Sequence, residues 1–247
     1  MWSIGSVAQA SPSATSPRTI NYSATAGKLY VVVLSRATAA DPFTAVTDNV
    51  GNTWERITYA PVSGTVGRRI EMWQCELASP FSTITISFTG SGQAQATLVE
   101  ISGHATDGDP VDAFNAGFSS GTTTPPSITV TPSVSGALVL GALQANSNTD
   151  SQITASSGWT RLSTNSQGPS LAYRVDTTEG VAVGVSWTQT ASVGSGQAII
   201  AVLPGEDGPP PEGLTVTVWN GSSEVPAVIE GVWNGTSVVA VDSISVA

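Results

Sequence analysis

The chain has 247 residues, of which 40% are hydrophobic and 11% are charged, well below the roughly 25% charged residues of an ordinary soluble domain. Its net charge is −10 at pH 7. Because an acidic surface repels phosphate backbones, we expect no nucleic-acid binding. We expect no membrane insertion either, since no run approaches the ~20 apolar residues of a membrane helix.

The first residues of the chain predict an extended arm. Residues 1–10 (MWSIGSVAQA) lack the basic start and the long apolar run of a signal peptide. Residues 1–18 are rich in Ser, Ala and Pro, which favours an extended segment over a folded one.

Strand patterns dominate the middle of the chain. Residues 29–34 (LYVVVL) predict a strand that is buried on both faces. Residues 83–88 (TITISF) alternate and place Ile84, Ile86 and Phe88 on one face, and residues 127–131 and 181–187 repeat this pattern. Turn residues separate these runs at short intervals, and we find no amphipathic helix. The fold class is therefore predicted to be all-β.

The body of the chain also contains landmarks that recur in the same order at an offset of roughly one hundred residues. This favours an internally duplicated antiparallel β-sandwich, jelly-roll- or lectin-like. The halves could be two tandem sandwiches or one interleaved sandwich, and we favour two tightly packed repeats. Four landmarks of the first half correspond to four of the second. Residues 27–31 correspond to 136–140, and 51–57 to 158–162. Phe88 and residues 92–94 correspond to Trp187 and residues 196–198, and 101–103 correspond to 203–205.

The C-terminal region carries a small tandem repeat, residues 218–223 (VWNGSS) and 232–237 (VWNGTS). Asn-Gly favours a type I′ turn, so each unit predicts a strand, a tight turn and a second strand. Such a unit is too small to bury a core and must stack on something else. We therefore expect interface or glycan contacts at four residues: Trp219, Asn220, Trp233 and Asn234.

Together these patterns predict six segments. They are an arm (1–18), a first sandwich repeat (19–103), a crossover segment (104–126), a second sandwich repeat (127–205), a Pro-rich linker (206–213) and the C-terminal β-hairpin repeats (214–247).

Two patterns suggest hydrolytic chemistry at first sight. Residues 117–121 (GFSSG) have the spacing of a nucleophile elbow around Ser119, but the single histidine, His104, precedes it and no helix follows. Glu71 and Glu76 lie on one predicted strand, but residues five apart point to opposite faces, so they are interpreted as surface carboxylates rather than a glycosidase pair. We expect no catalytic residues.

Metal and cofactor sites are not expected. Asp107, Asp109 and Asp112 have the spacing of oxygen ligands for calcium, but a polar turn is the favoured interpretation. His104 and the single thiol, Cys75, are too few for a zinc site, and Cys75 is predicted to be a small core residue. Residues 48–52 (DNVGN) predict a turn with hydrogen bonds to Asp48 and Asn49 and a positive φ at Gly51.

The tryptophans offer a choice between core packing and sugar stacking. Trp54 and Trp159 occupy matching positions in the two repeats, which favours a core role, as does the alternating strand around Trp187. Trp219 and Trp233 could pack on each other or on a neighbouring subunit.

A family resemblance follows from these residues. The run from 27 to 103, with its 46–54 turn, the Trp73 strand and the ISG ending at 101–103, resembles a sandwich module of virion proteins. It is similar to minor tail and head-decoration proteins of phages that infect actinobacteria, and the Trp-Asn-Gly pair looks like their short tail repeats. The resemblance implies a non-enzymatic virion structural protein, a minor tail component ahead of a capsid decoration protein. A carbohydrate-binding surface-attachment module is the alternative.

The same resemblance implies the setting of the protein. Its partners would be other virion proteins, further copies of itself in a homo-oligomer, and, for the alternative, a glycan of the host cell surface. It would be made in the host cytoplasm and exposed on the exterior of the virion.

Overall fold

The computed structural model describes residues 1–36, 43–60, 69–76, 79–90, 92–145, 152–162 and 168–205, and the backbone of 216–219 and 224–227. These residues contain β-strands in antiparallel sheets and no α-helix, so the all-β prediction is confirmed. In the same part of the chain, no helix has the length and apolar character needed to cross a membrane.

Among the described residues, the first half of the body contains eight strands. They form a five-stranded sheet of order β1-β8-β3-β6-β5 and a three-stranded sheet of order β2-β7-β4. The strands are β1 (Ser3–Ser13), β2 (Arg18–Asn21), β3 (Leu29–Arg36), β4 (Phe43–Asp48), β5 (Glu55–Ala60), β6 (Arg69–Glu76), β7 (Thr83–Phe88) and β8 (Ala94–Ser102).

The second half forms another five-stranded sheet, of order β13-β14-β11-β17-β9, and two strand pairs, β10-β15 and β12-β16. Its strands are β9 (Val111–Thr122), β10 (Ile128–Val130), β11 (Leu138–Ala145), β12 (Ile153–Ala155), β13 (Thr160–Leu162), β14 (Ser170–Arg174), β15 (Val183–Val185), β16 (Trp187–Gln189) and β17 (Val193–Val202).

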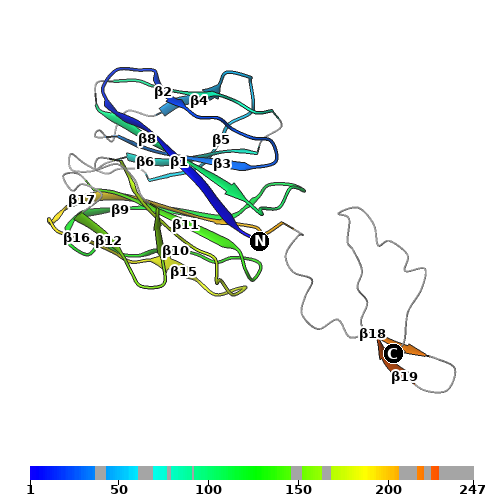
Figure 1. Cartoon of the computed structure of the whole chain (residues 1–247). Helices are drawn as coiled ribbons and strands as arrows, with labels where there is room; N and C mark the ends of the chain where they lie inside the picture. Colours follow the sequence, from blue (N-terminus) through cyan, green and yellow to red (C-terminus); the bar gives the residue numbers. More distant parts are fainter. Residues whose placement is uncertain are drawn as a thin grey trace.

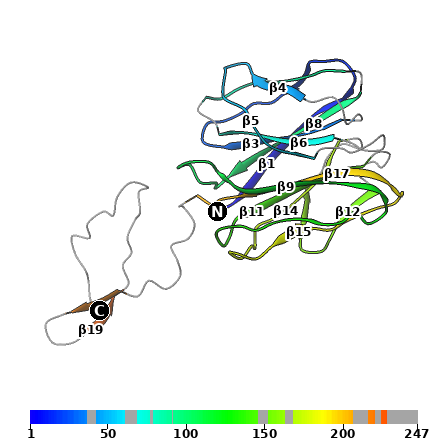
Figure 2. The same ribbon diagram turned by 180° about the vertical axis from the view of Figure 1, so that it is seen from behind.

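Each half is a sandwich, and the two five-stranded sheets face each other, as the opposite views of Figures 1 and 2 show. One core lies between the two sheets of the first half, around Tyr30, Ile84 and Phe81. Another lies between the second five-stranded sheet and its two strand pairs, around Val139 and Trp187.

Between the two halves lies a further apolar layer, which we call the middle layer. Its buried members come from the first sheet (Leu29, Val31, Val33, Ala60, Ile70, Met72, Val99 and Ile101) and from the second (Leu138, Leu140, Ala142, Leu162, Leu171, Ala198, Ile200 and Val202). Strands β3 and β11 are consequently buried along their whole length on both faces. The prediction of a doubly buried strand at residues 29–34 is confirmed.

Other local predictions are also confirmed. Ile84, Ile86 and Phe88 are buried on one face of β7, and Cys75 is a buried core residue. Gly51 has a φ of 85°, in the left-handed region that glycine adopts without strain. The Asp48 Oδ1 atom accepts hydrogen bonds from the backbone N of Val50, Gly51 and Asn52, at 3.0, 2.8 and 3.1 Å.

Two segments differ from their predicted roles. Residues 3–13, expected in an arm, form β1 at the edge of the first sheet, where they pair with β8. Their alternation is weak, but Ile4 and Val7 pack against the middle layer. Residues 111–122, expected in the crossover, form β9 and pair with β17, so the second sheet begins before residue 127.

The C-terminal strands are β18 (Val216–Trp219) and β19 (Glu224–Ala227), which pair antiparallel. This agrees with the strand pair predicted for the first Trp-Asn-Gly unit. The register joins Trp219 to Glu224, so four residues separate the paired ends, whereas a type I′ turn leaves two. The Pro-rich linker and the second unit lie outside the described residues.

Candidate functional site

A pocket of about 300 Å³ opens where the edge of the first five-stranded sheet meets the loop between the two halves. Its walls come from the start of β5, the end of β6 and the loop before β9. The lining residues are Thr53, Glu55, Gln74, Glu76, Gly108, Asp109 and Pro110.

Strand register brings three of these side chains together. Glu55 on β5 is the cross-strand partner of Gln74 on β6, and directly opposed residues have their side chains on the same face. Glu76 follows Gln74 by two positions and therefore shares that face. The same face carries Ile70 and Met72 into the middle layer, so β6 changes from apolar to polar as it leaves the layer.

The loop that completes the pocket is held from both sides. The Gln74 Nε2 atom donates to Asp109 Oδ1 at 3.0 Å, and the backbone N of Val111 donates to the same oxygen at 2.9 Å. The loop also exchanges backbone hydrogen bonds with the end of β17: Ala105 N donates to Leu203 O and Leu203 N donates to Pro110 O. The second half thus fixes a loop that lines a pocket of the first.

The pocket is acidic and rich in hydrogen-bond acceptors. Burial raises the pKa of Glu76, and the nearby carboxylates of Asp109 and Asp107 raise it further. Gln74 is only 8% exposed, and its Oε1 atom, which is itself enclosed, accepts no hydrogen bond from the residues that the structure describes. A buried acceptor without a partner costs free energy.

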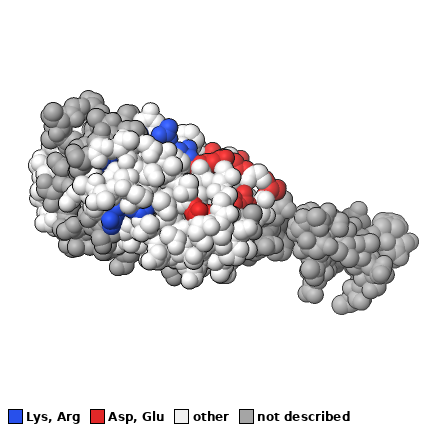
Figure 3. Space-filling model, turned by 90° about the horizontal axis from the view of Figure 1, so that it is seen from above, with Lys and Arg blue, Asp and Glu red and all other residues white. Residues whose placement is uncertain are grey.

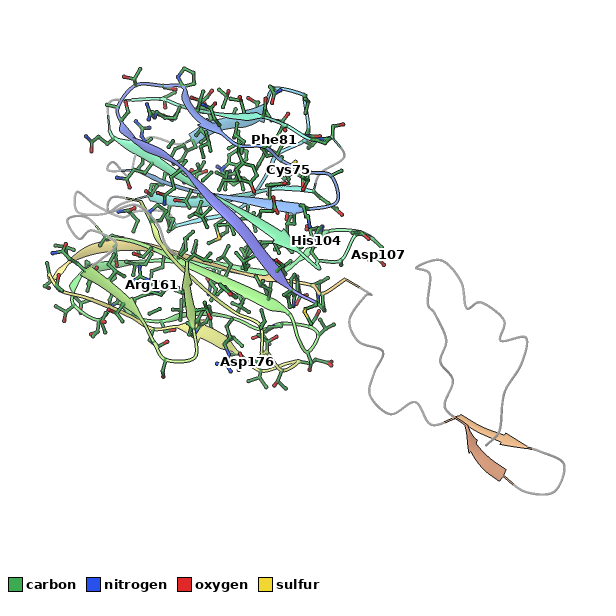
Figure 4. The ribbon with its side chains drawn as sticks, viewed as in Figure 1. Cys75, Phe81, His104, Asp107, Arg161 and Asp176 are labelled. Atoms are coloured by element: carbon green, nitrogen blue, oxygen red, sulfur yellow. The ribbon has the colours of Figure 1, made fainter. Side chains whose placement is uncertain are left out.

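His104 lies close to the pocket, and Figure 4 shows it near Asp107 where the loop leaves the body. Its side chain is almost fully buried, and its Nε2 atom is 3.8 Å from Glu76 Oε1. Within the described part of the chain, neither ring nitrogen has a hydrogen-bond partner. Burial lowers the pKa of His104, and the charge of Lys28 lowers it further.

Of the three aspartates with calcium-like spacing, Asp112 lies apart, whereas Asp107 and Asp109 both lie near Glu76. Asp109 turns into the pocket, whereas Asp112 accepts a hydrogen bond from the backbone N of Ser133 at 2.6 Å. In the described part of the chain, no three His, Cys, Asp or Glu residues lie close enough together to hold a metal ion.

The prediction that Glu71 is a surface carboxylate is wrong. Its side chain is fully buried and pairs with Arg69, accepts a hydrogen bond from Trp73 Nε1 at 2.9 Å and lies 3.9 Å from an Arg56 nitrogen. The signal was present in the sequence, because Arg69 and Trp73 stand two residues before and after Glu71 on the same strand face.

Glu76, in contrast, is exposed as predicted. Cys75 packs in the first core, and alternation along β6 directs Glu71 to the same side as Cys75 and Glu76 to the opposite side. The two carboxylates therefore do not converge. Ser119 lies on β9 opposite Ser195, in a continuous strand rather than a strand–turn–helix, so it lacks the setting of a nucleophile elbow.

The described tryptophan side chains pack into the body. Trp54 and Trp187 are buried, which confirms their predicted core role, and Trp159 packs against the core of the second half. Trp2 Nε1 donates to Gly136 O at 2.7 Å, and Trp73 packs against the first core. Trp219 is described as backbone in β18, and Asn220, Trp233 and Asn234 lie outside the described residues.

Comparison of the chain with protein-family models, curated proteins and solved structures finds no match.

Proposed function

We propose that the chain is a non-enzymatic structural protein of a phage virion, exposed on the particle exterior as a minor tail component. The main support for this proposal is that the two sandwiches of the body bury a shared apolar layer between them. Such an extensive apolar contact favours one rigid block over two independently moving domains.

The C-terminal strands support an attachment role. β18 and β19 have four residues each, and a two-stranded hairpin of this size is marginal in water. It would gain stability by docking on a neighbouring virion subunit or on another copy of the chain in a homo-oligomer.

We further infer that the body is an internal duplication of a jelly-roll-like sandwich. The order β1-β8-β3-β6-β5 corresponds strand by strand to β9-β17-β11-β14-β13. In the first half, β2 and β4 both pair with β7. In the second half, β10 pairs with β15 and β12 pairs with β16, so β15 and β16 together take the place of β7. Matching landmark glycines have similar positive φ, 72° at Gly27 and 76° at Gly136, and 85° at Gly51 and 83° at Gly158.

Two alternatives share this body. A capsid decoration protein would dock on the head lattice instead of the tail. A carbohydrate-binding module would need exposed aromatic rings for sugar stacking, and the five tryptophan side chains that the structure describes are buried or half-buried. The exposed aromatic rings of the described body are instead those of Tyr59 and Phe114, and further glycan contacts would fall to Trp219 and Trp233.

The experiment that tests the proposal is immunogold labelling of gradient-purified particles from the phage whose genome encodes this chain. We expect gold on the tail. Gold on the head would replace the tail assignment with capsid decoration. The virion proposal would be overturned if the chain were absent from the particles and if it bound a glycan that the Trp219→Ala and Trp233→Ala variants no longer bind.

A further inference from the structure

The two five-stranded sheets have four edge strands, β1, β5, β9 and β13, and an edge strand can pair with another chain unless something prevents it. Three of these edges are interrupted or charged. The register of β1 shifts after Ile4 and again after Ala10, and that of β5 shifts after Arg56. β13 spans Thr160–Leu162 in the described part of the chain and has Arg161 at its centre. Bulges and charged residues are devices by which proteins prevent pairing at sheet edges.

β9 lacks these devices over most of its length. Its register with β17 is unbroken from Ala113 to Ser119, and this run (AFNAGFS) contains no charged residue and no proline. Among the described residues, no strand pairs with the outer edge of β9. The run, which we call the open edge, is therefore exposed to pairing with a further strand.

One hydrogen bond shows which backbone groups of the open edge point outward. The backbone N of Ala116 donates to the Oδ1 atom of the exposed Asn115 side chain at 2.8 Å. Because a side chain and not a β17 carbonyl takes this bond, the N–H group of Ala116 points away from β17. Backbone groups alternate between the two sides of a strand, so those of Phe114 and Phe118 also point outward. A second strand would replace the Asn115 side chain with a backbone carbonyl.

The open edge is complementary to a second copy of itself. In an antiparallel pairing centred on Ala116, Phe114 of each copy lies opposite Phe118 of the other, and Ala113 lies opposite Ser119. Opposed side chains share one face of a sheet, and aromatic pairs across strands are stabilising. Phe114 is 59% exposed and Phe118 is half-buried, so the pairing covers apolar surface that a single copy leaves in water.

The charges of the chain permit this contact. Each copy has a net charge of −10, so a contact between copies must keep acidic side chains apart. On the face seen in Figure 3, the acidic side chains gather in one band and do not cover the surface. Continued outward, the register centred on Ala116 places Asp112 opposite Ser120 and not opposite Asp112 of the other copy.

We propose that β9 of one copy pairs antiparallel with β9 of a second copy about a two-fold axis at Ala116, so that two five-stranded sheets become one continuous sheet. The contact is closed, since each copy presents the same residues to the other. It names a surface for contact between copies that the virion proposal leaves open, and it does not depend on a place in the particle.

Sedimentation velocity of the full chain at increasing concentration measures the association, and we expect a reversible equilibrium between monomer and dimer. Amide hydrogen exchange, followed by NMR below and above the midpoint of that equilibrium, locates the contact. The outward amides of Phe114, Ala116 and Phe118 should exchange more slowly in the dimer. The amides of Asn115 and Gly117, which face β17, should keep their rates.

Two variants should each weaken the dimer by about tenfold or more, because every change occurs twice in a two-fold contact. Phe114→Lys removes an aromatic partner and adds a charge at an exposed position. Ala116→Pro removes an outward N–H group, which an edge strand tolerates because the ladder with β17 does not use it. Val181→Lys is the matched control, since Val181 is 54% exposed and lies outside β9, and it should leave the dimer unchanged. Circular dichroism checks that each variant folds.

Three results would overturn the proposal. They are a chain that is monomeric at every concentration, a dimer that Phe114→Lys and Ala116→Pro leave intact, and a dimer without slower exchange at the outward amides. The first would leave the open edge to a strand of a different protein, and the second would place the contact between copies elsewhere on the chain. Each result is independent of where the chain lies on a particle, so failure here is distinguishable from failure of the virion proposal.

Discussion

Asp48 organises the turn that leads into the pocket-forming strand β5. Besides three backbone N–H groups, its carboxylate accepts hydrogen bonds from Asn52 Nδ2 at 2.9 Å and Trp54 Nε1 at 3.0 Å. Burial works against ionisation of Asp48, but these hydrogen bonds outweigh it and lower its pKa. The side chain therefore links a surface turn to a core tryptophan.

The Asp48→Ala variant should lower the free energy of unfolding by about 2–3 kcal/mol, because several donors lose a charged acceptor. Chemical denaturation monitored by circular dichroism measures this loss. Asp176→Ala is the control, since Asp176 is exposed and its pKa is lowered mainly by its hydrogen bond to Arg174; it should change stability little. Equal losses in the two variants would contradict the role given to Asp48.

His104 predicts a pH dependence of stability. Its folded pKa lies below 6.5, so the unfolded chain takes up the proton first and the free energy of unfolding falls as pH is lowered from about 6.5. Glu76 acts in the opposite sense at lower pH, because its raised pKa makes protonation more favourable in the folded state.

The measurement is a series of denaturation curves across this pH range in a Glu76→Gln background, which removes the opposing contribution. His104→Gln, which cannot be protonated, should flatten the dependence below pH 6.5. An unchanged slope in the His104→Gln variant would show that another group causes it.

At the scale of elements, β11 depends on a residue without a side chain. A Cβ placed on Gly141 would lie 2.6 Å from Val185 Cγ1 and 3.8 Å from the Trp159 ring, so β15 can approach the sheet because position 141 is glycine. Gly141→Ala should therefore lower the free energy of unfolding by about 1–3 kcal/mol, the usual range for overpacking.

The adjacent valine provides the internal control. In a Val185→Ala background the clash is relieved, so adding Gly141→Ala should cost less than it does in the natural sequence. A double-mutant cycle by denaturation measures the difference. Additive losses would mean that the Gly141 effect does not come from contact with Val185.

Much of the element pattern could be predicted because it depends on local spacing. The β-branched run of β3 and the alternation of β7 each specify burial directly. β1 and β9 could not be identified in this way, because edge strands need fewer apolar residues and their partners, β8 and β17, are distant in sequence. The pocket was missed for the same reason, since Glu55, Gln74 and Asp109 meet only through strand register and a loop fixed by the second half.

At the scale of the whole molecule, the middle layer makes the two halves interdependent. Its residues are buried only while both five-stranded sheets are in place, and neither half could keep that surface dry alone. Leu140 on β11 is fully buried in this layer.

Leu140→Ala should therefore weaken the first half as well as the second, by about 2–5 kcal/mol in the shared unfolding transition. Hydrogen exchange of the β3 and β8 amides reports on the first half. We expect the β3 and β8 amides to exchange faster in the variant, to the same extent as the β11 amides. Faster exchange confined to the second half would mean that the sandwiches unfold separately.

Cryo-electron microscopy of the phage particle, at a resolution that separates the sandwiches, tests the proposed virion role directly. We expect paired sandwich density on the exterior of the tail, with the two five-stranded sheets in contact and the β18–β19 strands against a neighbouring subunit. A particle map without this density would contradict the assignment of the chain as a structural part of the virion.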